Sequence, residues 1–248
     1  MLSFVCRTNY STDMKHVLFI VLFFSKFNLL AQDSPINVYF FPGTGSDERI
    51  FSKIQLPAGY QAHFIQYPVP QKKATMAEYA ALLAQQIDTS QTFVLVGVSV
   101  GGMICTELAE QLKPQKTIII SSAKCRSELP RHYRFQRYLP INKLFGPRFI
   151  KAMSFVAQAV VEPDRNKHKA TFKAMLSDKK PLYLKRTVNM IVNWEREGYS
   201  PNIVHIHGTN DHTLPLRNIS PSTIIQGGSH MMTLTRGEEI NALIVENL

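Results

Sequence analysis

The sequence predicts an α/β fold in which helices cover both faces of a mainly parallel sheet of about six strands. Short apolar runs rich in Val and Ile recur along the chain, and most lack the polar alternation of a half-exposed strand. Segments with helical spacing of apolar residues separate these runs, as in successive strand–helix–strand units. The chain has 248 residues, of which 45% are hydrophobic, so it can bury a large core and is not globally disordered.

The predicted elements can be placed along the chain in order. The strands are expected at residues 37–41, 60–67, 93–96, 117–121, 202–207 and 222–226. Core helices are expected at residues 47–53, at 76–87 with Thr75 as N-cap, at 103–112 and at 237–247.

Residues 126 to about 198 interrupt this alternation and are expected to form a helical insertion. They contain no convincing strand, and helical spacing occurs at 144–161, 168–176 and 182–197. Residues 124–197 carry 17 Lys and Arg against 6 Asp and Glu, whereas the remainder after residue 31 carries 8 against 11. A solvated helical face explains this charge, and the sharper hypothesis is binding to an anionic membrane surface or polyanionic envelope material. No nucleic-acid recognition motif accompanies the charge, so no nucleic-acid partner is expected.

Residues 1–31 are expected to be a signal peptide or N-terminal leader. Lys15 precedes an apolar run at 17–24, and Ala31 is a small residue before a polar stretch. The run is shorter than the ~20 residues that span a bilayer. We therefore predict export to the periplasm or the cell exterior, with Met14 as an alternative start. An uncleaved anchor or a buried segment is the alternative interpretation.

A serine stands between one predicted strand and the helix that follows it. Gly97-Val98-Ser99-Val100-Gly101 matches G-x-S-x-G, in which glycines avoid collisions between a side chain and the neighbouring backbone. Such a turn exposes the serine hydroxyl and places the Val100 amide at a helix N-terminus, where it can donate to an oxyanion. The motif alone arises by chance in roughly one chain in ten of this length. It therefore needs partners elsewhere in the chain.

A base and an orienting acid for Ser99 can be sought at the carboxyl edge of the predicted sheet. Among eight histidines, His230 directly follows the last strand and precedes the last helix, so it lies on a loop at this edge. Asp211 is the only carboxylate in the loop after the preceding strand. An Asx turn beside Pro215 is the alternative role for Asp211.

The chain order Ser99, Asp211, His230 resembles that of the α/β-hydrolase superfamily. From residue 36 onward the chain resembles its small, lid-bearing, esterase-like members, on four motifs: Pro-Gly-Thr-Gly at 42–45, Gly-Val-Ser-Val-Gly at 97–101, Gly-Thr-Asn-Asp at 208–211 and Gly-Ser-His at 228–230. The resemblance implies an α/β-hydrolase domain at 32–248 with a helical lid at about 126–198.

The resemblance also implies an oxyanion hole and a reduced sheet. The backbone amide of Thr44 would join that of Val100 as the second donor. Pro42 stands where the family commonly has His, so the anchoring of this loop must differ. The chain enters at the third family strand, which implies six strands, all parallel, with residues 60–67 at an edge.

The favoured function is a serine hydrolase that cleaves a carboxylic ester or thioester through an acyl-enzyme on Ser99, with His230 as base and Asp211 as orienting acid. The expected substrate is a small-molecule or lipid-like acyl compound. No cofactor or metal is expected, and Cys6, Cys105 and Cys125 form no metal-binding spacing. The alternatives are an acyltransferase with the same triad and a non-catalytic hydrolase-like binding protein. Five insertion residues are candidates to line an acyl pocket, with packing against the core as the alternative: Phe149, Met153, Phe155, Phe172 and Met175.

Overall fold

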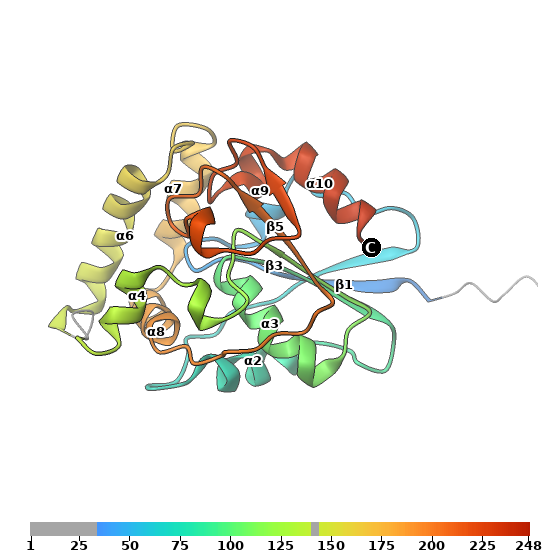
Figure 1. Ribbon diagram of the computed structural model, residues 1–248, viewed down its shortest axis with the longest axis horizontal. Helices are drawn as coiled ribbons and strands as arrows, with labels where there is room; N and C mark the ends of the chain where they lie inside the picture. The colour runs from blue at the N-terminus through green and yellow to red at the C-terminus, as the bar shows by residue number, and fades with distance from the viewer. Residues whose placement is uncertain (1–33, 140–143) are drawn as a thin grey trace, which may run out of the picture. The chain divides into compact units, whose positions relative to one another are not determined.

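A single six-stranded parallel sheet lies at the centre of the computed structural model, which describes residues 34–139 and 144–248 (Figure 1). The strands run in the order β2–β1–β3–β4–β5–β6, and all five neighbouring pairs are parallel. Their bounds are β1 Ile36–Phe41, β2 Tyr60–Phe64, β3 Phe93–Val98, β4 Lys116–Ile120, β5 Ile203–Gly208 and β6 Thr223–Ile225. The predicted parallel sheet is confirmed, and β2 lies at its edge. The leader predicted at residues 1–31 lies outside the described residues.

Both faces of the sheet are buried along β1, β3, β4 and β5, which explains why these strands lack polar alternation, whereas the edge strand β2 is largely exposed. In β1, Tyr39 and Phe41 pack on one side with helices α2 (Met76–Ala84) and α3 (Val100–Leu112). Val38 and Phe40 pack on the other side with the 3-10 helix η1 (Glu48–Phe51) and helices α9 (Met232–Thr235) and α10 (Gly237–Glu246). Figure 1 shows these two helical layers on opposite sides of the sheet.

Several core elements are shorter than predicted: the helix expected at 47–53 is only the 3-10 helix η1, and the strand expected at 222–226 is β6 over three residues. Strand β2 ends at Phe64, because the chain then turns away through Pro68 and Pro70. Helix α2 begins after Thr75 as predicted, with a full capping box to Glu78, but it ends at Ala84.

Among the described residues, four α-helices lie between β4 and β5 and form the helical insertion: α4 Arg131–Gln136, α6 Pro147–Val161, α7 Lys169–Asp178 and α8 Pro181–Val192. The sequence did not predict α4. The helix predicted at 182–197 ends at Val192, because Trp194 donates its indole N–H to Glu107 of α3 at 2.6 Å. Arg196 also pairs with Glu107 at 3.0 Å, so this segment is held against the core in an extended form.

None of the helices in the described ranges has the length and apolar character needed to cross a bilayer.

Candidate active site

Ser99 lies in a strained turn between β3 and α3. Its backbone has φ 54° and ψ −121°, a conformation that non-glycine residues rarely adopt. The flanking glycines make this turn possible. A Cβ on Gly97 would lie 2.5 Å from the Gly101 carbonyl oxygen, and one on Gly101 would lie 2.1 Å from the Phe41 carbonyl oxygen. The close backbone approach expected from the G-x-S-x-G motif is therefore present.

The structure brings Ser99, His230 and Asp211 into one hydrogen-bonded row. Ser99 Oγ lies 3.0 Å from His230 Nε2, and His230 Nδ1 lies 2.8 Å from Asp211 Oδ2. These distances fit a tautomer in which Nδ1 carries the proton and donates to Asp211, which leaves Nε2 as acceptor for the Ser99 hydroxyl. The three residues come from loops after β3, β5 and β6, all at the carboxyl edge of the sheet.

Asp211 makes an Asx turn and also binds His230. Its Oδ1 accepts the backbone N–H groups of Thr213 at 2.9 Å and Leu214 at 2.8 Å, while Oδ2 faces His230. Both roles predicted for Asp211 are therefore present: Oδ1 makes the Asx turn, and Oδ2 binds His230. With the residue only 2% exposed, this turn fixes the carboxylate toward the imidazole.

The pKa of His230 is raised and that of Asp211 is lowered relative to their ordinary values. Burial alone would lower the pKa of His230, but the charge and hydrogen bond of Asp211, with a further contribution from Glu162, raise it above its ordinary value of 6.5. Burial alone would raise the pKa of Asp211, and the charges of His230 and His207 together with its hydrogen bonds lower it instead. Asp211 therefore stays ionised and favours a protonated His230.

Two further histidines lie behind Asp211, in β5. His207 Nε2 lies 2.8 Å from the Leu214 carbonyl oxygen and 3.5 Å from Asp211 Oδ2, so it carries the proton there. His207 Nδ1 then accepts from His205 Nε2 at 3.3 Å. Both side chains are fully buried, and burial lowers the pKa of each, which favours their neutral forms. They brace the loop that carries Asp211.

The loop after β1 lies directly beside Ser99. A Cβ on Gly43 would lie 3.3 Å from Ser99 Cβ. The Gly43 amide is occupied by Ser46 Oγ at 2.8 Å, whereas within the described ranges the Thr44 and Val100 amides donate no hydrogen bond. Both amides are thus available near the Ser99 hydroxyl, as the oxyanion hole requires.

The unusual Pro42 in this loop is anchored by a residue that the sequence did not single out. The Tyr67 hydroxyl donates to the Pro42 carbonyl oxygen at 3.1 Å. The ring of Tyr67 packs against those of Tyr79 and Tyr183. This contact accounts for how the loop is held without the more common histidine.

A cavity of about 240 Å³ opens onto Ser99 and His230 between the sheet edge and the helical insertion. The insertion contributes apolar and small side chains to it: Tyr133, Ser154, Ala157, Gln158, Phe172, Leu176, Leu184, Val188 and Ile191. Of the five liners predicted from sequence, only Phe172 is among them. Phe149 and Met153 point to solvent, Met175 packs in the core below, and Phe155 packs beside Leu184. The candidate lining is therefore confirmed for Phe172, the alternative of packing holds for Met175 and Phe155, and neither holds for Phe149 and Met153, because the face of α6 toward the cavity carries the smaller or polar Ser154, Ala157 and Gln158.

Glu162, at the end of α6, is a site residue that sequence analysis missed. It is 3% exposed, and its Oε1 accepts the Asp164 N–H at 3.0 Å while its charge acts on His230. Only the packing of α6 brings it near His230, so no local pattern marks it. Within the parts of the chain that are described, no group of three His, Cys, Asp or Glu side chains could hold a metal ion.

Comparison with known proteins gives one family match and a set of similar folds. The model of the alpha/beta hydrolase family matches residues 22–243. No curated protein sequence matches the chain significantly. A thermophilic esterase from Thermogutta terrifontis superposes with a TM-score of 0.66 at 16% identity, covering 86% of this chain and 89% of that one.

Two other solved structures are similar to the same degree. An esterase from Exiguobacterium antarcticum has a TM-score of 0.63 at 17% identity, over 86% of this chain and 91% of its own. A lipase-esterase related protein from Clostridium acetobutylicum has a TM-score of 0.64 at 14% identity, over 87% and 96%. At these identities the likeness shows the fold alone.

Proposed function

The chain belongs to the alpha/beta hydrolase family, and from this premise we propose that it is a serine hydrolase that cleaves carboxylic esters or thioesters. The observation that carries the proposal is the row Ser99–His230–Asp211, with successive distances of 3.0 and 2.8 Å. A serine hydroxyl is a weak nucleophile until a base takes its proton. His230 Nε2 is placed to do so, beside two unoccupied backbone amides.

In the proposed reaction, Ser99 Oγ attacks the acyl carbon while its proton passes to His230 Nε2. The Thr44 and Val100 backbone N–H groups donate hydrogen bonds to the acyl oxygen, on which negative charge develops. His230 then gives the proton to the departing alcohol or thiol, which leaves the acyl group on Ser99. A water molecule that transfers a proton to His230 attacks this acyl-enzyme, and His230 returns that proton to Ser99 Oγ as the acid is released.

Asp211 supports both steps without itself taking a proton. Its hydrogen bond to Nδ1 keeps Nε2 free for the Ser99 hydroxyl, and its charge stabilises the imidazolium that forms. The two backbone donors on Oδ1 keep the carboxylate from turning away.

The cavity suggests a small acyl group. Its volume of about 240 Å³ is below the roughly 300–1,000 Å³ of pockets that hold drug-sized ligands. Apolar residues such as Phe172 and Leu176 line it, which suits an aliphatic chain better than a charged one. We therefore expect preference for short acyl chains.

The test is hydrolysis of p-nitrophenyl esters from acetate to palmitate by the wild type, Ser99→Ala and the surface control Ser52→Ala. We expect wild-type and control activity on acetate and butyrate, little on palmitate, and at least about 10⁴-fold less for Ser99→Ala. Equal turnover in Ser99→Ala would contradict the proposal, and a preference for palmitate would contradict the assigned pocket.

A further inference from the structure

The outward side of α6 carries an apolar stripe that nothing in the described structure covers. Phe149, Met153, Val156 and Val160 are spaced four, three and four residues apart, so they share one side of the helix, and each is between 43% and 73% exposed. The helix contains no acidic residue. Its other side faces the protein, where Ser154 and Gln158 line the cavity at Ser99.

Further exposed apolar side chains precede α6 along the chain. Phe145 stacks on Phe149 with ring centroids 4.4 Å apart, so the stripe extends past the start of the helix. The exposed apolar side chains next to it along the chain are Phe135, Tyr138, Leu139 and Leu144. Scattered apolar residues are normal on a protein surface, whereas a continuous set marks an interaction site.

The charge of the insertion is positive around this stripe. Its exposed basic residues include Arg131, Arg148, Arg165, Lys167, Lys169 and Lys173. Several of its acidic residues are already paired: Asp178 with Arg49, Glu195 with Arg137 and Asp164 with Lys167. Residues 124–197 carry 17 basic against 6 acidic residues, so the insertion keeps a net positive charge after these pairs are counted.

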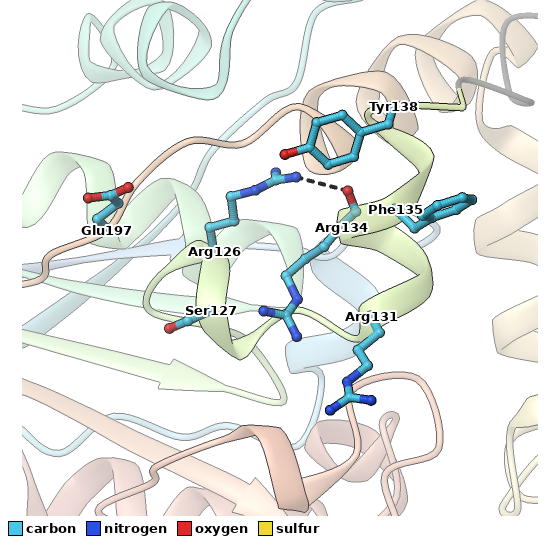
Figure 2. Close-up of a pocket in the computed structure, with 7 residues that line it drawn as sticks. All are labelled: Arg126, Ser127, Arg131, Arg134, Phe135, Tyr138 and Glu197. Atoms are coloured by element: carbon cyan, nitrogen blue, oxygen red, sulfur yellow. Dashed lines mark hydrogen bonds between the residues drawn. The ribbon is translucent and has the colours of Figure 1, made fainter.

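A cavity of about 660 Å³ lies beside α4 and shares no lining residue with the catalytic cavity. Figure 2 shows its lining, which includes Arg126, Arg131 and Arg134 together with the carboxylate of Glu197. The Arg126 guanidinium donates to the Arg134 carbonyl oxygen at 3.1 Å and to the Trp194 carbonyl oxygen at 2.7 Å, so it is fixed in place. Arg134 Nε is buried and has no hydrogen-bond partner among the residues that the structure describes. Figure 2 shows the guanidinium groups of Arg131 and Arg134 pointing to the same side of α4. Such a site suits an anionic headgroup.

We propose that this surface, formed by the apolar stripe of α6, the end of α4 and the arginines beside them, binds an anionic lipid membrane. A symmetric contact with a second copy would bring two strongly basic insertions together, which disfavours that occupant. Nucleic acid would match the charge but not the aliphatic stripe. An amphipathic helix with aromatic and aliphatic residues on one side and basic residues nearby is typical of binding at the membrane surface. The proposal concerns the outer side of α6 and does not depend on the chemistry at Ser99.

The test is flotation of the full chain with vesicles of phosphatidylcholine alone or with 30 mol% phosphatidylglycerol. The variant V156Q/V160Q removes part of the stripe without changing charge, and L82Q/V245Q makes the same kind of change on exposed sites of α2 and α10. All variants share residues 1–33, so any contribution of that segment is common to them. Thermal unfolding checks that each variant is folded.

We expect wild type and L82Q/V245Q to bind anionic vesicles, less so at 0.5 M NaCl, and V156Q/V160Q to bind at least about tenfold more weakly. R131Q/R148Q should lose about fivefold for each arginine removed. Equal binding to neutral vesicles, or wild-type binding by V156Q/V160Q, would overturn the proposal. So would a dimer without vesicles that V156Q/V160Q dissociates, because the stripe would then bind a second copy.

Discussion

The carboxyl edge of the sheet and the outer side of the helical insertion differ in almost every physical respect. At the sheet edge, Asp211 is buried, each of its oxygens has a partner, and Ser99 is held in a strained turn by glycines that no other residue could replace. Helix α6 has no fully buried residue, and its side chains Phe149, Met153, Val156 and Val160 face solvent. The proposed reaction at Ser99 therefore depends on rigid packing around the site, whereas the outer side of α6 is exposed and available to a binding partner.

The largest effect should come from Asp211→Asn, which keeps the shape of the site but removes the charge. The amide can donate to His230 Nδ1, which favours the tautomer with the proton on Nε2, so the base is lost. We expect kcat on a short ester to fall by about 10⁴-fold. Exposed Asp88→Asn serves as control, and a loss below tenfold would show that Asp211 does not orient His230.

Gly101→Ala should lower the free energy of unfolding by disrupting the packing at the Ser99 turn. The new Cβ would lie 2.1 Å from the Phe41 carbonyl oxygen, so β1 and α3 must separate. We expect a loss of about 3 kcal/mol in the free energy of unfolding, measured by urea denaturation. Gly146→Ala, in open space before α6, should change it little. Similar stability of both variants would contradict the close packing.

Two valine substitutions compare the regions directly. Val96 is fully buried in β3, and Val96→Ala should cost about 2 kcal/mol of unfolding free energy. Val156 is half exposed on α6, and Val156→Ala should change stability by no more than about 0.5 kcal/mol. Equal costs would mean that the stripe is packed within the protein and not available to a partner.

The smallest effect should come from Glu162→Gln, which alters only the pH dependence. His230 must be neutral to accept a proton, and its pKa is raised, so kcat/KM should rise with pH through a midpoint above about 6.5. Because Glu162 contributes to this rise, Glu162→Gln should move the midpoint to lower pH, while the amide oxygen can still accept the Asp164 N–H. Exposed Glu238→Gln should leave the midpoint unchanged, and an upward shift in Glu162→Gln would refute the assigned interaction.

The same contrast explains what the sequence could predict. The strands, the turn at Ser99 and the loops of Asp211 and His230 are marked by local patterns, because the backbone there must adopt one conformation and the strand ends share one edge. The sides of α6 are not marked in this way. Phe149 and Met153 were candidates for the pocket lining or for packing against the core, yet they face solvent, and Glu162 was not singled out. Which side of an apolar helix faces the protein is decided by packing that brings distant segments together.

The anchor at Pro42 shows the same limit. The departure from the common His was visible in the sequence, but its replacement by Tyr67 depends on the path of the chain after β2. Likewise, His205 and His207 could be placed in a strand, whereas their role behind Asp211 follows from the return of the loop to Leu214.

In the proposed mechanism, His230 activates Ser99 as a nucleophile. Labelling with a fluorophosphonate probe, followed by intact-mass analysis, tests it most directly in wild type, Ser99→Ala and His230→Gln. We expect one adduct on the wild type at Ser99, none on Ser99→Ala, and labelling at least about 10³-fold slower in His230→Gln. Activation of Ser99 by His230 would be contradicted if the folded wild type did not react. It would also be contradicted if His230→Gln reacted as fast as the wild type.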